Sequence, residues 1–393
     1  DPGYETLLNN LAMLYHEMVQ YENSERLYLE SLDIREKAQG RQHADFARTQ
    51  NNLANLYYSM GNYEKAEPLY RESKDIREQV LGKSHGDYAT SLNNLALLKL
   101  NTKQYDEAER LYRQSLEIRH SILGENHPDY PMSLNNLATL YLYQGQYEKA
   151  EPLYLESKTI RKRILGPEHP DYIASVGSVA ALFERLQRYQ ESDTLLLEAA
   201  TQQRARLRKA ITYLTKNELA DYNKLFESDG HKLLNYLLNR QNTHQALGAL
   251  PVLCFDNALF YKGFLLTAAA HLNRLAASEP NTYLTNQELK TCRRQLAVEY
   301  SKPIAERKNV AELEERANTY EKELVRSVSG FAEARREIRW DDVRRQLRKT
   351  EMAIEFVHFP YYDQKGKPTD STLYAALVLG PSGRESSSPH FVY

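Results

Sequence analysis

Residues 51–54 read Asn-Asn-Leu-Ala, and the same four residues occur three more times in the chain. The repeated leucines lie 42 residues apart, at Leu11, Leu53, Leu95 and Leu137. A second phrase keeps the same step and begins at Tyr21, Tyr63, Tyr105, Tyr147 and Tyr189. A fixed period between about 20 and 50 residues is typical of a solenoid built from stacked units. We therefore predict a mainly α-helical solenoid.

Each unit reads as two helices and a loop. In the second complete unit, Gly61-Asn62 ends one amphipathic helix and residues 63–77 supply another. Gly82 suits a helix end because glycine adopts positive φ without a side-chain penalty. Asp87 suits the N-cap of the next helix because its side chain can accept unpaired amide hydrogens. One unit cannot bury its own apolar face, so the units must stack.

These residues carry a family resemblance. Leu53-Ala54-x-x-Tyr57, with Ala66 and Tyr70, resembles the tetratricopeptide signature. The 42-residue length and the Leu-Gly-x-x-His-Pro-Asp-Tyr loop at 123–130 and 165–172 resemble the kinesin-light-chain type of that repeat. The resemblance covers about residues 3 to 200 and implies a right-handed α-solenoid of helix-turn-helix units. The fifth unit, where Gly177-Ser178 replaces Asn-Asn, is expected to be a degenerate terminal repeat.

Composition excludes several function classes. The 393 residues carry 51 basic and 53 acidic side chains, so no global field favours nucleic acid or an anionic membrane. No run of about 18 apolar residues predicts a membrane span. Cys254 and Cys292 lack a four-ligand pattern, which favours reduced, packed thiols. We expect a cytoplasmic protein without cofactor or metal. Because the chain opens with Asp1 and closes on a strand-like stretch, we expect both ends to be cut.

The sequence after the repeats changes character twice. We predict three parts: a solenoid of five units over 1–200, a helical connecting region over 201–335, and the start of an α/β domain over 336–393. Two strand-like stretches are residues 353–359 and 373–379, with residues 363–371 as a polar connection.

Trp340-x-x-Val343-x-x-x-Leu347, followed by the two strand-like stretches, resembles the opening of a CHAT domain, the caspase-like domain found after tetratricopeptide repeats. The resemblance implies a truncated α/β domain whose His and Cys would lie further downstream. His358 lies within a strand and no Cys follows Cys292, so no catalytic residue is assigned. This chain is not expected to be an enzyme, whereas its full-length parent would be a cysteine peptidase or a pseudoprotease.

The candidate binding residues lie in the repeats. In tetratricopeptide folds, the two positions before the repeated Leu face partly toward the inner groove. An Asn amide offers both a donor and an acceptor, so a row of them can pair with the backbone of an extended peptide. Alternatively, one Asn of each pair braces the neighbouring helix. The predicted groove residues are Asn9, Asn10, Arg48, Asn51, Asn52, Asn55, Tyr58, Ser59, Asn93, Asn94, Asn101, Asn135, Asn136 and Tyr143.

The periodic histidines His43, His85, His127 and His169 lie a full repeat apart, too far to share one metal ion, so we expect them to brace loops. The favoured function is a protein-binding arm that senses or recruits partners for a caspase-like protease or pseudoprotease. The alternative is a scaffold or cargo adaptor without protease activity. The expected partner is a protein or an extended peptide, and the open C-terminal strand edge could support self-association.

Overall fold

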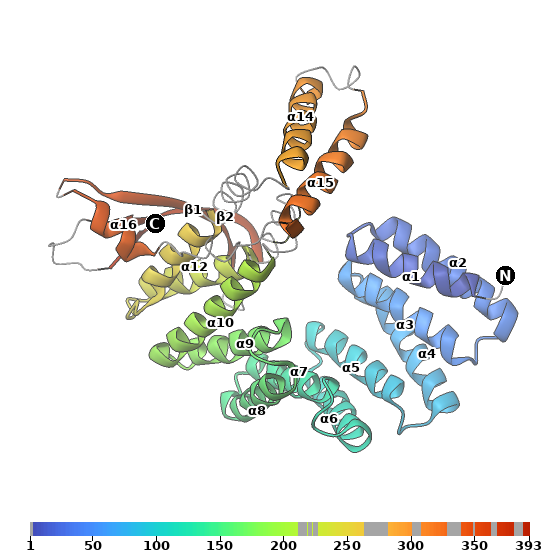
Figure 1. Ribbon diagram of the computed structural model, residues 1–393. Coiled ribbons are helices and arrows are strands. Elements are labelled where there is room, and N and C mark those ends of the chain that lie inside the picture. The colour runs from blue at the N-terminus through green and yellow to red at the C-terminus, as the bar shows by residue number, and fades with distance from the viewer. Residues whose placement is uncertain are drawn as a thin grey trace. The chain divides into compact units, whose positions relative to one another are not determined.

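The computed structural model describes residues 3–210, 218, 222, 227–262, 282–300, 308–327, 339–348, 350–362, 368–380 and 388–393 (Figure 1). The chain divides into two compact units, Asp1–Leu182 and Phe183–Tyr393, and each is described by itself. The predicted boundaries at residues 200 and 335 remain predictions.

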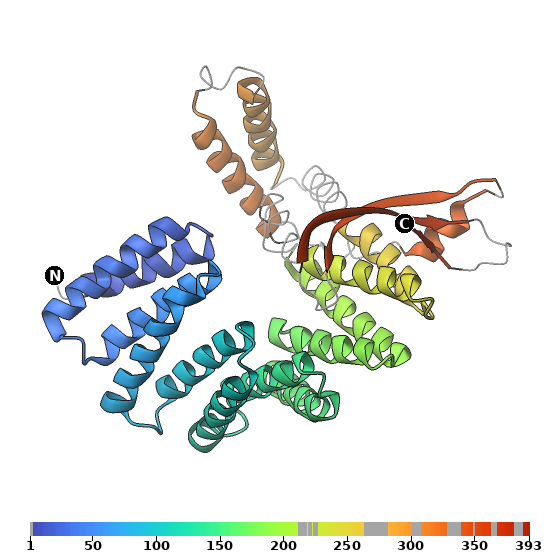
Figure 2. The ribbon, with the colours of Figure 1, turned by 180° about the vertical axis from the view of Figure 1, so that it is seen from behind.

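The first unit is a curved row of helix pairs. They are α1 (Tyr4–Glu17) with α2 (Tyr21–Gln39), α3 (Ala44–Ser59) with α4 (Tyr63–Leu81), α5 (Gly86–Asn101) with α6 (Tyr105–Leu123), and α7 (Asp129–Tyr143) with α8 (Tyr147–Leu165). Helix α9 (Pro170–Arg185) runs across the boundary between the units. The helix pairs confirm the predicted 42-residue unit, since each second helix begins at a repeated tyrosine. Figure 2 shows the row of helix pairs from behind.

Stacking buries the apolar face of every internal unit. Helix α2 contacts α3, α4 contacts α5 and α6 contacts α7. Leu53 and Leu56 are buried there, and fully burying a leucine is worth about 1.5–3 kcal/mol. Ala54 and Ala66 are fully buried, so α3 and α4 can approach closely. The first helices of successive units also contact one another, and we call the surface formed by α1, α3, α5 and α7 the inner surface (Figure 1).

The loops between units repeat one geometry. Gly82 follows α4 with φ +83°, as predicted for a glycine at a helix end. The N-cap prediction was wrong, because His85 rather than Asp87 caps α5: the His85 Nδ1 accepts a hydrogen bond from the Asp87 amide at 3.1 Å. The imidazole nitrogen reaches the amide two residues later and so satisfies a helix-end donor. Equivalent bonds at His43, His127 and His169 confirm that these histidines brace loops.

The second unit contains helices and one small sheet. Its described helices are α10 (Tyr189–Ala210), α12 (Glu227–Asn242), residues 250–262, α14 (Tyr283–Tyr300), α15 (Val310–Ser327) and α16 (Trp340–Gln346). Helices α14 and α15 contact each other as a hairpin. The part of the predicted helical region at residues 263–281 lies outside the described residues, as do 301–307 and 328–338.

The sheet contains three antiparallel strands in the order β1 (Ala353–Tyr362), β2 (Pro368–Leu379) and β3 (His390–Val392). Both predicted strands are confirmed and are longer than expected. The prediction of a polar connection over 363–371 was wrong for residues 368–371, which belong to β2, while 363–367 lie outside the described residues. The backbone pairing continues there because β1 also extends to Tyr362, which pairs with Pro368.

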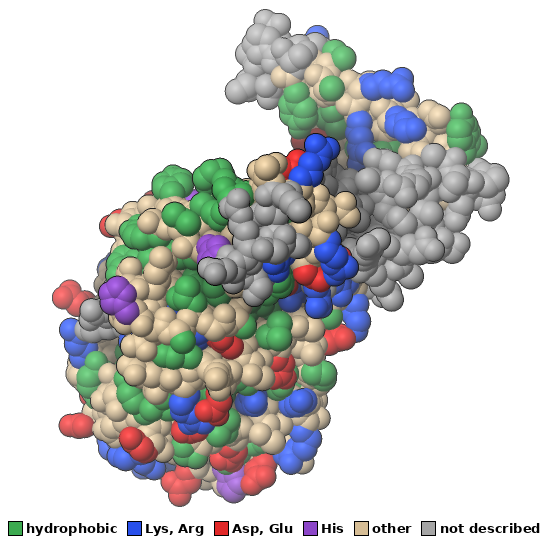
Figure 3. Space-filling model, turned by 90° about the vertical axis from the view of Figure 1, so that its left-hand side faces the viewer, with side chains coloured by type: hydrophobic (Ala, Val, Ile, Leu, Met, Phe, Trp, Pro, Cys, Tyr) green, Lys and Arg blue, Asp and Glu red, His purple; other side chains and the backbone are tan. Residues whose placement is uncertain are grey.

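Apolar side chains lie on both faces of this sheet. Phe359, Leu377 and Phe391 are buried on one face. The Asn235 side chain of α12 bonds the backbone of the edge strand β1, at Pro360 and Tyr362, with both distances 3.0 Å. On the opposite face, four large apolar side chains are exposed: Ile354, Phe356, Tyr374 and Val392. Figure 3 views the side of the molecule that carries the strands, where hydrophobic side chains gather. The helices in the described part of the chain include none with the length and apolarity of a transmembrane segment.

Candidate functional site

The paired asparagines form a hydrogen-bonded ladder along the inner surface. The side chain of the second Asn in each unit donates to the side-chain oxygen of the first Asn in the preceding unit. The three rungs are Asn52 to Asn9 at 3.1 Å, Asn94 to Asn51 at 3.1 Å, and Asn136 to Asn93 at 2.8 Å. Neighbouring first helices are therefore joined by side-chain amides as well as by apolar packing.

The two members of each pair differ in burial. Asn9, Asn51 and Asn93 are buried, and only 4% of Asn51 is exposed. Asn52, Asn94 and Asn136 are half-buried, and Asn10 is exposed. No hydrogen bond of the described residues uses the side-chain oxygens of Asn52, Asn94 and Asn136. The ladder thus leaves these oxygens without a hydrogen bond, whereas Asn9, Asn51 and Asn93 brace the neighbouring helix.

The ladder stops at the fourth unit. Asn135 occupies the accepting position, but the residue that would donate to it in the fifth unit is Ser178. The shorter Ser178 side chain bonds to the Ala174 carbonyl within its own helix. Consequently the buried side-chain oxygen of Asn135 has no hydrogen-bond partner in the described part of the chain. The sequence departure at Gly177-Ser178 therefore marks the end of the ladder.

A second row of polar contacts joins the first helices about two helical turns after the Asn pairs. The Asn101 side chain donates to the Tyr58 hydroxyl at 2.6 Å, and His16 Nε2 lies 2.9 Å from Ser59 Oγ. Burial raises the pKa of Tyr58 to about 12, with smaller contributions from Tyr63 and Tyr143. Tyr58 therefore stays a neutral hydroxyl at physiological pH.

The remaining predicted groove residues are distributed along this row and the first turns of the helices. Tyr143 is 43% exposed, which leaves a ring edge open to a ligand. Arg48 is exposed and lies 2.8 Å from the Asp45 carboxylate. The Asn55 oxygen accepts hydrogen bonds from Tyr70 at 2.6 Å and Asn94 at 3.4 Å, so it is already engaged within the fold.

The residue at the Asn55 position decides whether the neighbouring buried tyrosine is satisfied. The Tyr70 hydroxyl donates a hydrogen bond to Asn55, and the Tyr154 hydroxyl lies 2.9 Å from the Thr139 hydroxyl. The corresponding residue in the third unit is Leu97, and the buried Tyr112 hydroxyl has no partner among the described residues.

A row of buried arginines was missed by the sequence interpretation. An Ile-Arg pair recurs every 42 residues, so the sequence contained a signal for this row. The buried arginines are Arg35, Arg77, Arg119 and Arg161. Arg77 donates to the Ser91 hydroxyl at 2.8 Å, and Arg119 donates to the Ser133 hydroxyl at 2.9 Å, each in the next unit. Burial lowers the pKa of Arg77 and Arg119 despite the nearby aspartates. These residues fasten one unit to the next rather than face a ligand.

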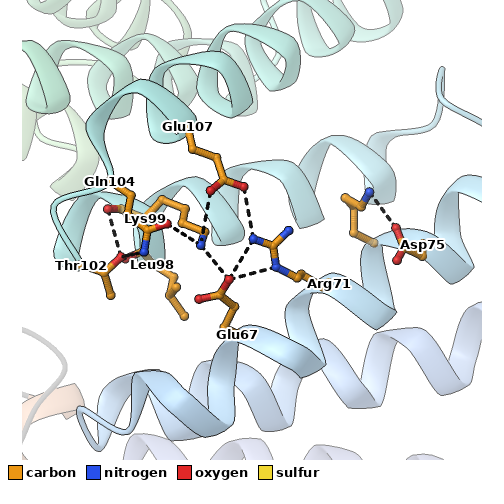
Figure 4. Close-up of polar contacts among 9 residues, drawn as sticks. Glu67, Arg71, Asp75, Leu98, Lys99, Thr102, Gln104 and Glu107 are labelled. Carbon is orange, nitrogen blue, oxygen red and sulfur yellow. Dashed lines mark hydrogen bonds and ion pairs between the residues drawn. The ribbon is translucent and has the colours of Figure 1, made fainter.

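The third unit carries a buried lysine where its neighbours carry tyrosine. Tyr57 and Tyr141 donate to the glutamates at positions 25 and 109 of the preceding second helices, whereas Lys99 lies 2.7 Å from the equivalent Glu67. Figure 4 shows Lys99, Glu67, Arg71 and Glu107 pointing toward one another from α4, α5 and α6. Lys99 is only 2% exposed.

Burial opposes ionisation of Glu67, but hydrogen bonds and charges from Lys99 and Arg71 outweigh it and hold the pKa of Glu67 below its ordinary value. Lys99 also lies 3.3 Å from Glu107. The second and fourth units have a lysine at the position of Glu107, and these lysines, Lys65 and Lys149, lie over the rings of Tyr57 and Tyr141. In this one unit the cation therefore comes from the first helix instead of the second, a glutamate stands at the lysine position, and opposite charges remain paired.

Neither cysteine has the surroundings of a nucleophile. Cys254 and Cys292 are free and buried. Burial raises the pKa of Cys254, which disfavours the reactive thiolate. Within the described ranges, no group of three or more His, Cys, Asp or Glu side chains could hold a metal ion.

The tetratricopeptide repeat family model matches residues 4–79, 45–121, 87–161 and 129–205, overlapping matches that together span more than half of the chain. The chain belongs to the tetratricopeptide repeat family. Tetratricopeptide repeats indicate a protein-protein interaction module. Among curated proteins, no relative matches the sequence.

Several solved structures are similar to this chain. A putative kinesin light chain from Podospora anserina is 26% identical, with 52% of this chain and 96% of that chain covered and a TM-score of 0.45. BtubC from P. vanneervenii is 23% identical, with 51% and 79% covered and a TM-score of 0.45. A Rap protein in complex with competence and sporulation factor is 14% identical, with 84% and 76% covered and a TM-score of 0.48.

Proposed function

We propose that the inner surface of the repeats binds an extended segment of a protein partner. The observation that carries this proposal is the row of half-buried amides at Asn52, Asn94 and Asn136, whose oxygens accept no hydrogen bond within the described fold. Each oxygen can accept a hydrogen bond from a peptide N–H group. Because such a bond contributes only about 0.5–1.5 kcal/mol, several must act together.

The spacing of the amides suits an extended chain. Neighbouring helices pack about 8–10 Å apart, and an extended peptide advances about 3.3 Å per residue. One Asn would therefore meet roughly every third residue of the ligand. The buried partners Asn9, Asn51 and Asn93 hold the amides of the next unit in place, so the ligand would not have to order them.

Residues beside the ladder would select the partner. The exposed ring of Tyr143, the hydroxyl of Tyr58 and the amide of Asn101 form a polar and aromatic mixture, which favours a peptide over a lipid. Ser59 and Arg48 extend this surface along α3, and Asn10 extends it along α1.

The test is peptide selection on the purified chain, followed by calorimetry with the selected peptides. Tyr143→Ala removes an exposed ring, and Asn94→Ala with Asn136→Ala removes two free acceptors. We expect each to weaken binding at least about tenfold. Gln114→Ala, an exposed change on α6, is the control and should leave affinity unchanged. Peptides whose affinity survives all groove changes would place the binding surface elsewhere.

The role of the second unit is a separate proposal: the repeats serve as the sensing or recruiting arm of a CHAT-type domain. In support, the β1–β2–β3 sheet has apolar side chains on both faces, as a sheet inside an α/β domain does. The alternative is a scaffold or cargo adaptor without protease activity. Reading the parent open reading frame beyond Tyr393 separates the two, because a His and a Cys at strand ends favour the first.

A further inference from the structure

The half-buried amides of the inner surface form one row that crosses three successive helices. Asn52 lies on α3, Asn94 on α5 and Asn136 on α7, and α5 contacts both α3 and α7 (Figure 1). Each of the three side chains is held by the same kind of bond, from its nitrogen to an Asn oxygen of the preceding unit. Because packed helices lie about 8–10 Å apart, the three side-chain oxygens repeat at about that distance.

This row offers acceptors more than donors. The Asn94 nitrogen donates to Asn51 at 3.1 Å and to Asn55 at 3.4 Å, which uses both of its hydrogens. The nitrogens of Asn52 and Asn136 each donate one bond to the preceding unit. The oxygens of all three accept no hydrogen bond from the described residues. A ligand that satisfies the row must therefore present N–H groups along one of its sides, about 8–10 Å apart.

The regular backbone conformations differ in whether they can meet this spacing. An α-helix uses its N–H groups in its own hydrogen bonds. A β-strand directs successive N–H groups to opposite edges, so those on one edge recur about every 6.6–6.8 Å, and every second one of them about every 13 Å. A polyproline II helix has three residues per turn, a rise of about 3.1 Å per residue and no internal hydrogen bonds. Its N–H groups on one side recur about every 9.3 Å, which falls within the spacing of the helices.

We propose that the inner surface selects a segment in the polyproline II conformation, in which every third residue donates its N–H group to Asn52, Asn94 and Asn136 in turn. This inference rests on the function proposed above and names the conformation and sequence class of the partner. The residues at every third position cannot be proline, because proline has no N–H group. The two residues between them need no donor, so proline is allowed there. Prolines at these positions fix the conformation in advance and lower the cost of ordering the ligand.

Tyrosine rings near the row favour proline in the intervening positions. The ring of Tyr58 is half-buried and its centroid lies 5.5 Å from that of Tyr63. Tyr143 is 43% exposed and lies close enough to Tyr58 to contribute to the raised pKa of that residue. Proline-rich segments in the polyproline II conformation dock in grooves lined by aromatic rings. The rings of Tyr58 and Tyr143 therefore provide surfaces on which prolines of the ligand can pack.

Calorimetry with two acetylated nonapeptides of identical composition tests the proposal. Both contain three alanines and six prolines, and both adopt the polyproline II conformation. In the first, Ala-Pro-Pro repeats, so the N–H groups recur on one side of the helix. In the second, three prolines separate successive alanines, so the N–H groups face three different sides. The unchanged chain should bind the first peptide at least about tenfold more tightly, because only one N–H group of the second can meet the row.

The variant Asn94→Ala with Asn136→Ala leaves only one acceptor of the row, and a single acceptor cannot distinguish two spacings. This variant should bind the two nonapeptides with equal affinity. Gln114→Ala, on the exposed face of α6, is the matched control and should keep the preference of the unchanged chain. Thermal melts verify that both variants stay folded, and the comparison of the two peptides on the unchanged chain requires no variant.

Three outcomes would overturn the proposal. The first is equal affinity of the unchanged chain for the two nonapeptides. The second is tighter binding of an alternating Ala-Pro nonapeptide than of the Ala-Pro-Pro peptide, which would indicate a strand-like ligand. If that binding is weakened in the double Asn variant, the proposed function still holds and only the conformation is wrong. The third is that no peptide, selected or designed, loses affinity in the double Asn variant, in which case the proposed function fails and this inference fails with it.

Discussion

The side-chain nitrogen of Asn94 lies 3.1 Å from the side-chain oxygen of Asn51, 43 residues earlier in the chain. This bond spans two neighbouring units, so each amide of the inner surface is fixed by the unit before it. The Asn pairs consequently divide their tasks: Asn9, Asn51 and Asn93 stabilise the stack, and Asn52, Asn94 and Asn136 present oxygens that accept no hydrogen bond in the described chain.

Removing a buried member of the ladder should lower stability. Asn51→Ala and Asn93→Ala each delete an acceptor and should cost about 1 kcal/mol, because the donor in the next unit loses its partner. Asn135→Ala is the matched control and should cost less, since its oxygen accepts no bond in the described chain. Urea denaturation compares the three variants. Equal losses would contradict the ladder as a source of stability.

Two buried tyrosines should respond differently to loss of their hydroxyl. Tyr70→Phe should destabilise by about 1 kcal/mol, because Asn55 loses the shorter of its two hydrogen bonds. Tyr112→Phe should be neutral or stabilising, because this hydroxyl is buried without a partner in the described chain. Leu97→Thr should recreate the Thr139–Tyr154 pair and raise the melting temperature. Thermal melts provide the comparison, and a large loss in Tyr112→Phe would reveal an interaction of the hydroxyl.

Replacing Lys99 by the tyrosine of the neighbouring units should be tolerated only when Glu107 is replaced by lysine as well. Lys99→Tyr alone leaves Glu67 and Glu107 with only the exposed Arg71 as a shared cation and should destabilise by about 1–3 kcal/mol. Glu107→Lys in addition restores the tyrosine and lysine of the second and fourth units and should recover most of that loss. A double-mutant cycle in urea measures the coupling. Additive effects of the two substitutions on the free energy of unfolding would contradict this coupling.

The same cluster predicts an acid dependence. Because the pKa of Glu67 is lower in the folded chain, its stabilisation is fully present above the unfolded pKa of about 4.3 and is lost as pH falls through the folded value. The stability difference between the unchanged chain and Glu67→Gln should therefore shrink below about pH 4. Melting temperatures between pH 3 and 7 measure this difference, and a constant difference would contradict it.

In the second unit, Arg240 should be the most sensitive side chain outside the apolar core. It bonds Asp193 at 2.8 Å and also Glu184, and all three side chains are largely buried. Arg240→Met should cost about 3 kcal/mol because two buried carboxylates lose their cation. Lys232→Met, in an exposed pair with Asp229, is the control and should cost less than about 1 kcal/mol. Nearly equal denaturant midpoints for Arg240→Met and Lys232→Met would contradict this expectation.

The sequence alone determined the repeat architecture, because a 42-residue period places the same apolar and small residues at the same helix positions in every unit. It also determined the two strands, the glycine at each helix end and the bracing role of the loop histidines, all of which depend on neighbouring residues. The N-cap was misassigned because His85 and Asp87 can both satisfy the same helix end.

Only the tertiary structure decided which Asn of each pair is buried, since adjacent positions on a helix differ by about 100° and periodicity alone does not fix which one meets the next unit. It also decided that Arg77 lies inside the stack and that Lys99 replaces a tyrosine hydroxyl without loss of pairing. These outcomes depend on residues in adjacent units, distant along the chain, that come together only when the helices stack.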